Sequence, residues 1–190
     1  MAITADYNGQ TYVAFTDISG FKAMMTNENR LMHAMDALYS SGYRVLRNNQ
    51  RQPAIEGIFI SDCGILFARK THESALEALD SLLVVLSEIH RDVFESAFSL
   101  TTSIAYGPFA YRGKVEFEGL DKTAIHGHAY VSAIKDNESK APKLYPNECR
   151  ILKAGLPTEI SMNRIQTLNI ARRRIREEAK HFYFEWMKSQ

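Results

Sequence analysis

A buried strand that ends abruptly in an acidic turn constrains the fold of this chain more than any other sequence feature. Residues 11–16 are TYVAFT, and this apolar, β-branched and aromatic run is typical of a buried strand. The run stops at Asp17, and Ser19 and Gly20 follow. A carboxylate at the mouth of a buried strand can hold a metal ion, while the free N–H groups of the turn can contact phosphate oxygens. The alternative is an aspartate that only caps the turn.

A second acidic turn follows 45 residues later, at Asp62. Residues 55–68, IEGIFISDCGILFA, predict a β-hairpin with Asp62 at its tip, because two apolar runs flank a short polar turn. If the hairpin lies beside the first strand, Asp17 and Asp62 converge. Two carboxylates about 4 Å apart repel by roughly 4 kcal/mol at an effective dielectric constant of 20, so a bound cation would stabilise such a pair. Carboxylate oxygens suit Mg²⁺ or Mn²⁺ carrying a nucleotide phosphate.

Composition excludes several classes of protein. The chain has 190 residues, of which 45% are hydrophobic, and its formal net charge is +1. This balance fits one domain with an appendage and favours neither a nucleic-acid partner nor a disordered tail. Cys63 and Cys149 have no metal-binding spacing and indicate a reducing compartment. The sequence shows no signal peptide and no apolar run approaching about 20 residues, so we expect a cytoplasmic protein without a membrane partner.

The remaining periodicity predicts an α+β protein. We expect helices at 27–49, 71–95 and 127–137, a strand at 99–105 that stops at Gly107 and Pro108, a polar hairpin at 110–118, a closing strand at 150–154, and a helical segment at 159–190. The order strand, helix, helix, strand, strand, helix, strand is that of a ferredoxin-like palm, βααββαβ. We therefore predict a palm domain over residues 1–155 and a C-terminal helical extension over 156–190.

The acidic motifs resemble those of a known enzyme family. FTDISGF, around Asp17, resembles the first metal motif of the class III nucleotide cyclases (adenylate and guanylate cyclase catalytic domains), and ISDCG, around Asp62, resembles the second. Residues 103–138 resemble the strand, hairpin and helix that complete the cyclase site, so the resemblance covers residues 11–140. The phrases AYG and GHAYVSA are similar to the small stand-alone uridylate and cytidylate cyclases of the bacterial Pycsar antiphage systems.

The resemblance implies a role for particular residues. Asp17 and Asp62 would hold two Mg²⁺ or Mn²⁺ ions, assisted by the carbonyl of Ile18. The amides of Ser19, Gly20 and Phe21 would hold the β- and γ-phosphates with Lys22 nearby, and Lys135 takes the position of the family's catalytic arginine. The family also implies a homodimer with sites shared between subunits. From the helical pattern alone, Tyr43 is either a core tyrosine or a residue that leans toward the ligand.

The sequence departs from the purine cyclases at several positions. Their base-contacting lysine falls on Ile58 and their base-contacting aspartate on Ala124, which disfavours adenylyl and guanylyl cyclase activity. Their transition-state asparagine falls on Val131, and Lys135 keeps a positive charge without the bidentate geometry of arginine. His128 or Ser132 is a candidate substitute for the asparagine. His126 and His128 flank a glycine and form either a metal-binding pair or a surface turn.

Two hypotheses about function follow. The first is a homodimeric pyrimidine nucleotide cyclase that converts UTP or CTP to 3′,5′-cyclic UMP or CMP, a second messenger for a downstream effector protein in antiphage defence. The second is a degenerate palm that binds nucleotide and regulates a partner. A polymerase of the cyclic-dinucleotide or oligonucleotide type is disfavoured, because those palms resemble GGDD or GGDEF at the hairpin rather than SDCG.

Overall fold

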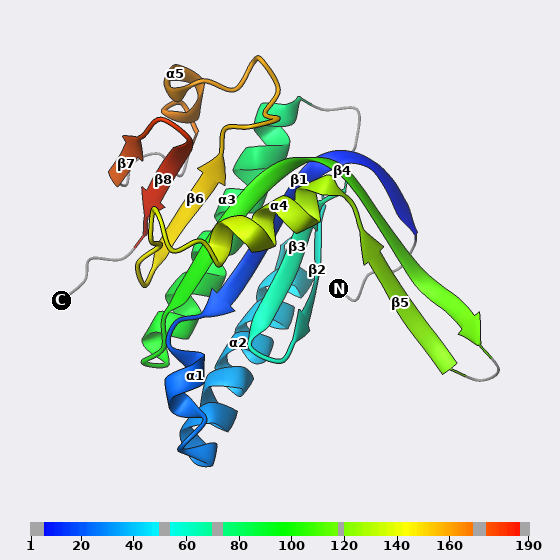
Figure 1. Cartoon of the computed structure of the whole chain (residues 1–190), viewed down its shortest axis with the longest axis vertical. Helices are drawn as coiled ribbons and strands as arrows, with labels where there is room; N and C mark the ends of the chain where they lie inside the picture. The colour runs from blue at the N-terminus through cyan, green and yellow to red at the C-terminus, as the bar shows by residue number, and fades with distance from the viewer. Residues whose placement is uncertain (1–5, 50–53, 70–73, 118–119, 169–173, 187–190) are drawn as a thin grey trace.

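The computed structural model describes residues 6–49, 54–69, 74–117, 120–168 and 174–186 (Figure 1). Within these residues, eight strands form one sheet in the order β2-β3-β1-β4-β6-β8-β7, with β5 paired to β4 off this path. The strands are β1 (Tyr7–Ile18), β2 (Ile55–Ile60), β3 (Cys63–Ala68), β4 (Leu100–Phe117), β5 (Leu120–His126), β6 (Glu148–Leu152), β7 (Arg174–Glu177) and β8 (His181–Glu185). The helices are α1 (Phe21–Met24), α2 (Glu28–Asn48), α3 (Ala75–Glu95), α4 (His128–Asn137) and α5 (Met162–Ile165). The order β1-α1-α2-β2-β3-α3-β4 confirms the predicted palm.

The strand that carries Asp17 lies in the middle of the sheet. β1 pairs antiparallel with β3 on one side and with β4 on the other. Its residues Tyr12, Val13 and Ala14 are completely buried, because helices cover both faces of the sheet at this point. The predicted strand and the predicted hairpin, β2 and β3, are therefore confirmed.

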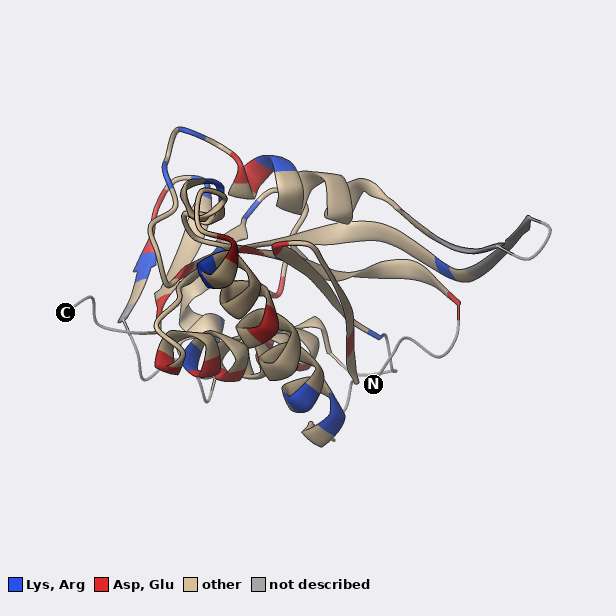
Figure 2. Cartoon of the chain, turned by 90° about the horizontal axis from the view of Figure 1, so that it is seen from below, with Lys and Arg blue, Asp and Glu red and all other residues tan. Residues whose placement is uncertain are grey.

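Helices α2 and α3 cover one face of the sheet, and α4 crosses the other (Figures 1 and 2). α2 begins after Asn27, whose side chain accepts a 3.1 Å hydrogen bond from the amide of Arg30. α3 begins after Ser74, which forms a capping box with Glu77. Residues 71–73 of the predicted helix lie outside the described residues. Lys, Arg, Asp and Glu occur along α2 and α3 in Figure 2, as expected for amphipathic helices on a sheet.

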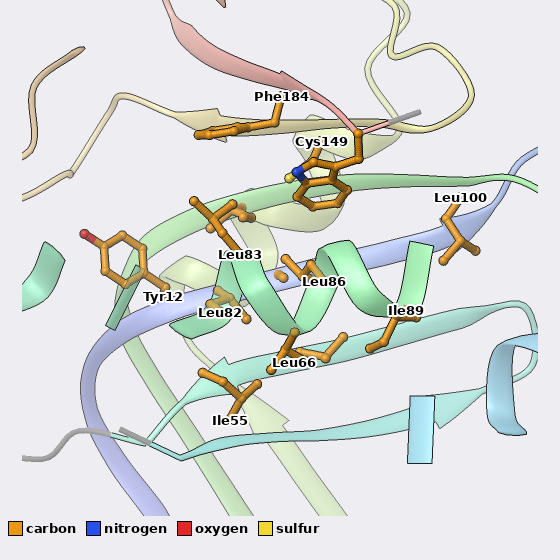
Figure 3. Close-up of a cluster of buried hydrophobic side chains, with 14 of the residues drawn as sticks. Tyr12, Ile55, Leu66, Leu82, Leu83, Leu86, Ile89, Leu100, Cys149 and Phe184 are labelled. Atoms are coloured by element: carbon orange, nitrogen blue, oxygen red, sulfur yellow. The ribbon is translucent and has the colours of Figure 1, made fainter. Parts of the chain in front are cut away.

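The main apolar core lies between the sheet and the helices α2 and α3. Figure 3 shows the leucine and isoleucine stripe of α3 against side chains from several strands, namely Tyr12, Ile55, Leu66, Leu100, Cys149 and Phe184. Helix α2 packs closely against β2 at Gly42, where an added Cβ would lie 2.1 Å from Cζ of Phe59. The helix continues through Gly42, and the ring of Phe59 occupies the space that a side chain at this position would need.

The predicted end of the fourth strand at Gly107 and Pro108 is wrong, since β4 continues to Phe117. β6 pairs with β4 at residues 102–104, and β5 pairs with it from Ala110 onward. On this edge of β4, Pro108 lies between the two ladders and interrupts neither of them, while on the other edge it pairs with Gln10 of β1. The hairpin predicted at 110–118 is therefore longer than expected: residues 110–117 are the end of β4, and β5 is the strand that pairs with them and projects with them from the body of the molecule in Figure 1.

The predicted C-terminal helical extension is also wrong. Among the described residues after 155, α5 is a single short helix, and β7 and β8 are strands. β8 pairs antiparallel with β6, so this segment extends the sheet of the palm. The aromatic run of β8 favours a strand, and Phe182 and Phe184 are buried in the main core. Residues 169–173 and 187–190 of the prediction lie outside the described residues. None of the described helices is both long and apolar enough to span a membrane.

Candidate active site

The end of β1 and the turn between β2 and β3 bring Asp17 and Asp62 together. Asp17 lies directly opposite Cys63 in the β1–β3 ladder, so Asp62 is one residue away from its pairing partner. The amide of Ile18 donates a 3.0 Å hydrogen bond to the carbonyl oxygen of Asp62. Asp17 lies on the same face as Val13 and Phe15, the face that α4 covers. The convergence expected from the sequence is therefore present.

The electrostatics of Asp17 reflect this proximity. Burial, followed by the negative charges of Asp62 and Glu138, raises the pKa of Asp17 to about 7. A cation between the carboxylates would remove the repulsion, and two carboxylates with a main-chain carbonyl are ligands that Mg²⁺ and Mn²⁺ accept. Within the described residues, no group of three or more His, Cys, Asp and Glu side chains is arranged to hold a metal ion, so the donor set here is the acidic pair.

The turn that carries Asp62 is held by its neighbours. Ser61 has a left-handed backbone conformation, with φ of 54°, which is uncommon for a residue with a side chain. The thiol of Cys63 donates to the carbonyl of Ile60 over 3.2 Å. Burial, with the charges of Asp62 and Asp17, raises the pKa of this thiol to about 11, so it remains a protonated donor at neutral pH. These contacts stabilise the conformation of the turn that carries Asp62.

The turn after β1 differs from the sequence prediction at Ser19. Its amide donates a 2.8 Å hydrogen bond to the carbonyl of Ser99, so the prediction that this amide is free for phosphate is wrong. Gly20 has φ of 77°, a left-handed conformation that glycine adopts without strain. Phe21 and Lys22 then begin α1, and the first N–H groups of a helix have no acceptor within it. The predicted phosphate loop is therefore reduced to Gly20, Phe21 and Lys22.

Three residues beside Asp17 were missed by the sequence analysis. Thr101 lies opposite Asp17 in the β1–β4 ladder, so the two side chains share a face. The hydroxyl of Thr101 lies 3.5 Å from Oδ1 of Asn137, at the end of α4. Glu138 follows, and its charge contributes to the raised pKa of Asp17. No local motif marks these residues, because the pairing of β1 with β4 brings Thr101 to the acid and the position of α4 brings Asn137 and Glu138 there.

The other predicted residues of α4 lie on its surface. Val131 is 43% exposed, and Lys135 is exposed one turn further along the helix. The ring nitrogen Nδ1 of His128 lies 3.4 Å from Oγ of Ser132, so these two candidates contact each other. His126 is exposed on β5, before the helix begins. Lys135 and Asp17 are on different elements, and no contact joins them among the described residues of a single chain.

The predicted base-contacting positions do not meet within one chain. Ile58 packs against the smaller apolar cluster on the α4 face, as does Ile125. Ala124 is the neighbour of Ile125, so it points to the opposite face of the β4–β5 hairpin, where its pairing partner is Arg112. Tyr43 is 42% exposed, and its ring centroid lies 5.1 Å from that of Phe59. It is a partly packed surface tyrosine, and its proposed contact with a ligand stays a prediction.

The palm topology and the acidic pair at adjoining strand ends define a cyclase-type fold, and structural comparison supports this assignment. The chain matches no protein-family model and no curated protein sequence. It superimposes on the adenylyl cyclase CyaB from P. aeruginosa with a TM-score of 0.65 over 98% of each chain, at 11% sequence identity.

Two guanylyl cyclase domains give similar values. The guanylate cyclase domain of RhGC from Catenaria anguillulae, in complex with GTP, has a TM-score of 0.64 and 10% identity, and the match covers 95% of this chain and 97% of that one. A non-canonical dimeric guanylyl cyclase domain of RhoGC from Blastocladiella emersonii has a TM-score of 0.60 and 11% identity over 95% and 97% of the two chains. The chain thus has the fold of nucleotide cyclase catalytic domains.

Proposed function

We propose that this chain is a nucleotide cyclase that converts a pyrimidine nucleoside triphosphate, UTP or CTP, to the 3′,5′-cyclic monophosphate and pyrophosphate. The observation that carries the proposal is the convergence of Asp17 and Asp62 at the end of the central strand. Structural carboxylates seldom lie together without a cation, because their repulsion is unfavourable in a partly buried site. The fold shared with adenylyl and guanylyl cyclases, one of them bound to GTP, supports a nucleoside triphosphate as the ligand.

In this reaction the ribose 3′-oxygen attacks the α-phosphorus in line as pyrophosphate leaves. When bound, two Mg²⁺ or Mn²⁺ ions supply Lewis-acid activation of the hydroxyl and neutralise charge on the phosphates. Asp17 and Asp62 would hold the ions, with the carbonyl of Ile18. The amides of Gly20, Phe21 and Lys22 would orient the β- and γ-phosphates, and their fixed dipoles need no reorganisation during the reaction.

Lys135 is the proposed cation at the transferred phosphate. Its exposed position on α4 allows it to reach a site on a second subunit, which is the arrangement that a homodimer with shared sites requires. A lysine supplies a point charge rather than a bidentate fork, so we expect slower turnover than an arginine at this position would give.

The choice of a pyrimidine rests on what the base-contacting positions lack. Ile58 and Ala124 offer no hydrogen bond to a purine, and an apolar pocket discriminates weakly between bases by itself. A cyclic pyrimidine nucleotide would then act as a second messenger on a separate effector protein. The resemblance of GHAYVSA to the Pycsar cyclases supports this role in antiphage defence.

A second candidate function is a non-catalytic palm that binds nucleotide and regulates a partner. Val131, which stands where the cyclases carry a transition-state asparagine, favours this alternative. A regulator has no need for two repelling carboxylates, so the acidic pair favours the enzyme.

Incubation of the purified protein with each of the four nucleoside triphosphates and Mn²⁺, followed by mass spectrometry of the products, tests the proposal. We expect cyclic UMP or cyclic CMP from the wild type and none from Asp17→Asn or Asp62→Asn, two variants that keep the shape of each side chain. A cyclic purine product would contradict the pyrimidine assignment. Binding of Mn²⁺ and nucleotide without any cyclic product would favour the regulator.

A further inference from the structure

We propose that Arg150 and His181, on the C-terminal strands, are positioning residues for the active site. Both hold Asp136, and through it they fix the last turn of α4, which carries Lys135 and lies beside Asp17. The inference rests on the proposed function, which gives Lys135 and Asp17 their roles. It adds Arg150, His181 and the last turn of α4 to the site.

Asp136 is held at three of its oxygen atoms. Its Oδ2 accepts a 2.7 Å hydrogen bond from Nε of Arg150, and its Oδ1 lies 2.8 Å from Nε2 of His181. A second guanidinium nitrogen of Arg150 donates to the main-chain carbonyl of Asp136, and the third donates to the carbonyl of Pro142 at 2.7 Å. The Arg150 side chain is 0% exposed and that of His181 is 3% exposed. The contacts therefore constrain both the side chain and the backbone of one helical residue.

The hydrogen bonds that join Asp136 to Arg150 and His181 hold the C-terminal end of α4, where the helix has no buried residue. The buried residues of α4 are Ala129 and Ala133, which lie in its first two turns. Both are small, so they bring the helix close to the sheet but do not fix the direction of its last turn. Arg150 and His181 come from β6 and β8, which pair with each other in the rigid sheet. The last turn is thus held from a different part of the sheet than the first two.

The charges around Asp136 stabilise its ionised carboxylate and so its contacts with Arg150 and His181. Burial alone would raise the pKa of Asp136, but the hydrogen bond from His181 and the charge of Arg150 outweigh burial and keep this pKa below its ordinary value. The carboxylate is therefore ionised at neutral pH, and hydrogen bonds to an ionised acceptor are shorter and stronger than neutral ones.

The held turn connects directly to the candidate site. Lys135 precedes Asp136, and Asn137 follows it and lies 3.5 Å from the hydroxyl of Thr101, opposite Asp17. A shift of this turn would move Lys135 relative to the phosphate that it contacts. Displacement of a catalytic group by about 1 Å costs on the order of 10²-fold in rate.

A double-mutant cycle between His181→Leu and Lys135→Met tests the proposal in the full-length protein. We expect His181→Leu to lower kcat at least tenfold with KM changed less than about twofold, because Lys135 acts on the transition state. Combined with Lys135→Met, it should lower kcat no further than Lys135→Met alone. Full multiplication of the two effects would overturn the proposal. His181→Gln, which keeps an N–H donor near the position of Nε2, should recover most of the lost rate.

A matched control separates positioning from general stabilisation of the C-terminal strands. Lys153 forms a 2.6 Å ion pair with Glu177 and lies 4.7 Å from the ring centroid of Phe182, and among the described residues no ion pair or hydrogen bond joins its side chain to α4. Lys153→Met should therefore leave kcat near the wild-type value. A loss of kcat equal to that of His181→Leu would show that any weakening of these strands suffices, and it would overturn the specific role of His181.

Hydrogen exchange provides a readout that does not depend on activity. In His181→Leu, amides of residues 134–138 should exchange faster, while those of β1 and β4 keep their protection. Arg150→Lys, which keeps the charge but loses the bonds to the two carbonyls, should give the same local effect and serves if His181→Leu does not fold. Unchanged exchange at 134–138 in a folded variant would overturn the proposal. A wild type without cyclase activity would contradict the proposed function instead, and the exchange result would still decide the role of the network.

Discussion

The amide of Ile18 donates a hydrogen bond of 3.0 Å to the carbonyl oxygen of Asp62, and this contact joins the end of the central strand to the β2–β3 turn. The separation of the two acidic residues is therefore set by the main chain. Substitution of either carboxylate by an amide should change charge and leave the backbone in place. Isosteric variants at Asp17 and Asp62 thus measure the electrostatic role of the pair.

Asp17→Asn should raise stability at neutral pH in the presence of EDTA. The pKa of Asp17 is about 7 in the folded protein and 3.8 in its ordinary state, so the folded protein binds more protons between these values. Stability from this group is therefore greatest below pH 4 and falls as the pH rises to about 7. Urea unfolding from pH 4 to pH 8 should show this fall in the wild type and a flatter profile in Asp17→Asn. A wild-type profile no steeper than that of the variant would contradict the convergence of the acids.

Mn²⁺ should stabilise the wild type far more than Asp17→Asn. A ligand at a hundredfold excess over its dissociation constant stabilises the folded state by about 2.7 kcal/mol. Thermal melts with increasing Mn²⁺ measure this shift, and Asp6→Asn, at an exposed acid remote from the site, is the matched control. Equal shifts in all three proteins would point to non-specific ion binding.

Two variants that have each lost most of their activity should recover part of it when they are mixed. In a dimer with shared sites, a heterodimer of Asp17→Asn and Lys135→Met carries both defects in one site and leaves the other intact. Random mixing would then give about one quarter of wild-type activity, because half of the dimers have one working site of two. Activity assays before and after subunit exchange measure the recovery. Mixed variants that recover no activity after proven exchange would place Asp17 and Lys135 in the same subunit's site.

Gly42→Ala should destabilise the protein by about 1–3 kcal/mol, the usual cost of overpacking. Its Cβ would lie 2.1 Å from Cζ of Phe59, so either α2 or the ring must move. Phe59→Leu in the same chain should recover part of the loss, although Phe59→Leu alone is destabilising. Chemical denaturation of the three variants measures the coupling, and simple addition of the two effects would contradict the close contact.

The buried His90 should make the protein sensitive to acid. Burial lowers the pKa of His90 to about 3 from an ordinary value of 6.5, and Nε2 lies 2.8 Å from the hydroxyl of Thr102. Stability from this group is complete above pH 6.5 and is lost as the pH falls toward 3, by up to about 3 kcal/mol at pH 4. His90→Gln, which cannot titrate, should show a smaller loss between pH 7 and pH 4 in urea unfolding. A parallel loss in both proteins would assign the acid sensitivity to other groups.

The sequence was sufficient to predict the acidic pair because each acid follows a short apolar run and begins a tight turn. Those signals are local, and they required only that the hairpin lie next to the first strand. Thr101, Asn137 and Glu138 carry no such signal, since the β1–β4 register places Thr101 opposite Asp17 and the packing of α4 brings Asn137 and Glu138 to the same place. The occupied amide of Ser19 was missed for the same reason, because its acceptor is Ser99, 80 residues away in the chain.

The C-terminal prediction failed because neighbouring residues gave conflicting local preferences. Residues 172–178, RRRIREE, favour a charged helix by composition, and the aromatic run at 182–186 favours a strand. Burial of Phe182 and Phe184 against the sheet decided between them. The sequence predicted Arg150 in a closing strand but did not predict its burial. A buried arginine needs an acidic partner, and only the folded structure shows that this partner is Asp136.

The position of β8 in the sheet has a consequence for synthesis on the ribosome. β8 joins the sheet through β6, and Phe182, Phe184 and Trp186 belong to the main core. The core of the palm is therefore completed only after these residues have been synthesised, later than all of β1 to α4. At about 5–20 residues per second, synthesis of the 34 residues from Lys153 to Trp186 takes roughly 2–7 s. Until β8 pairs with it, this edge of β6 is an open template for pairing with another strand.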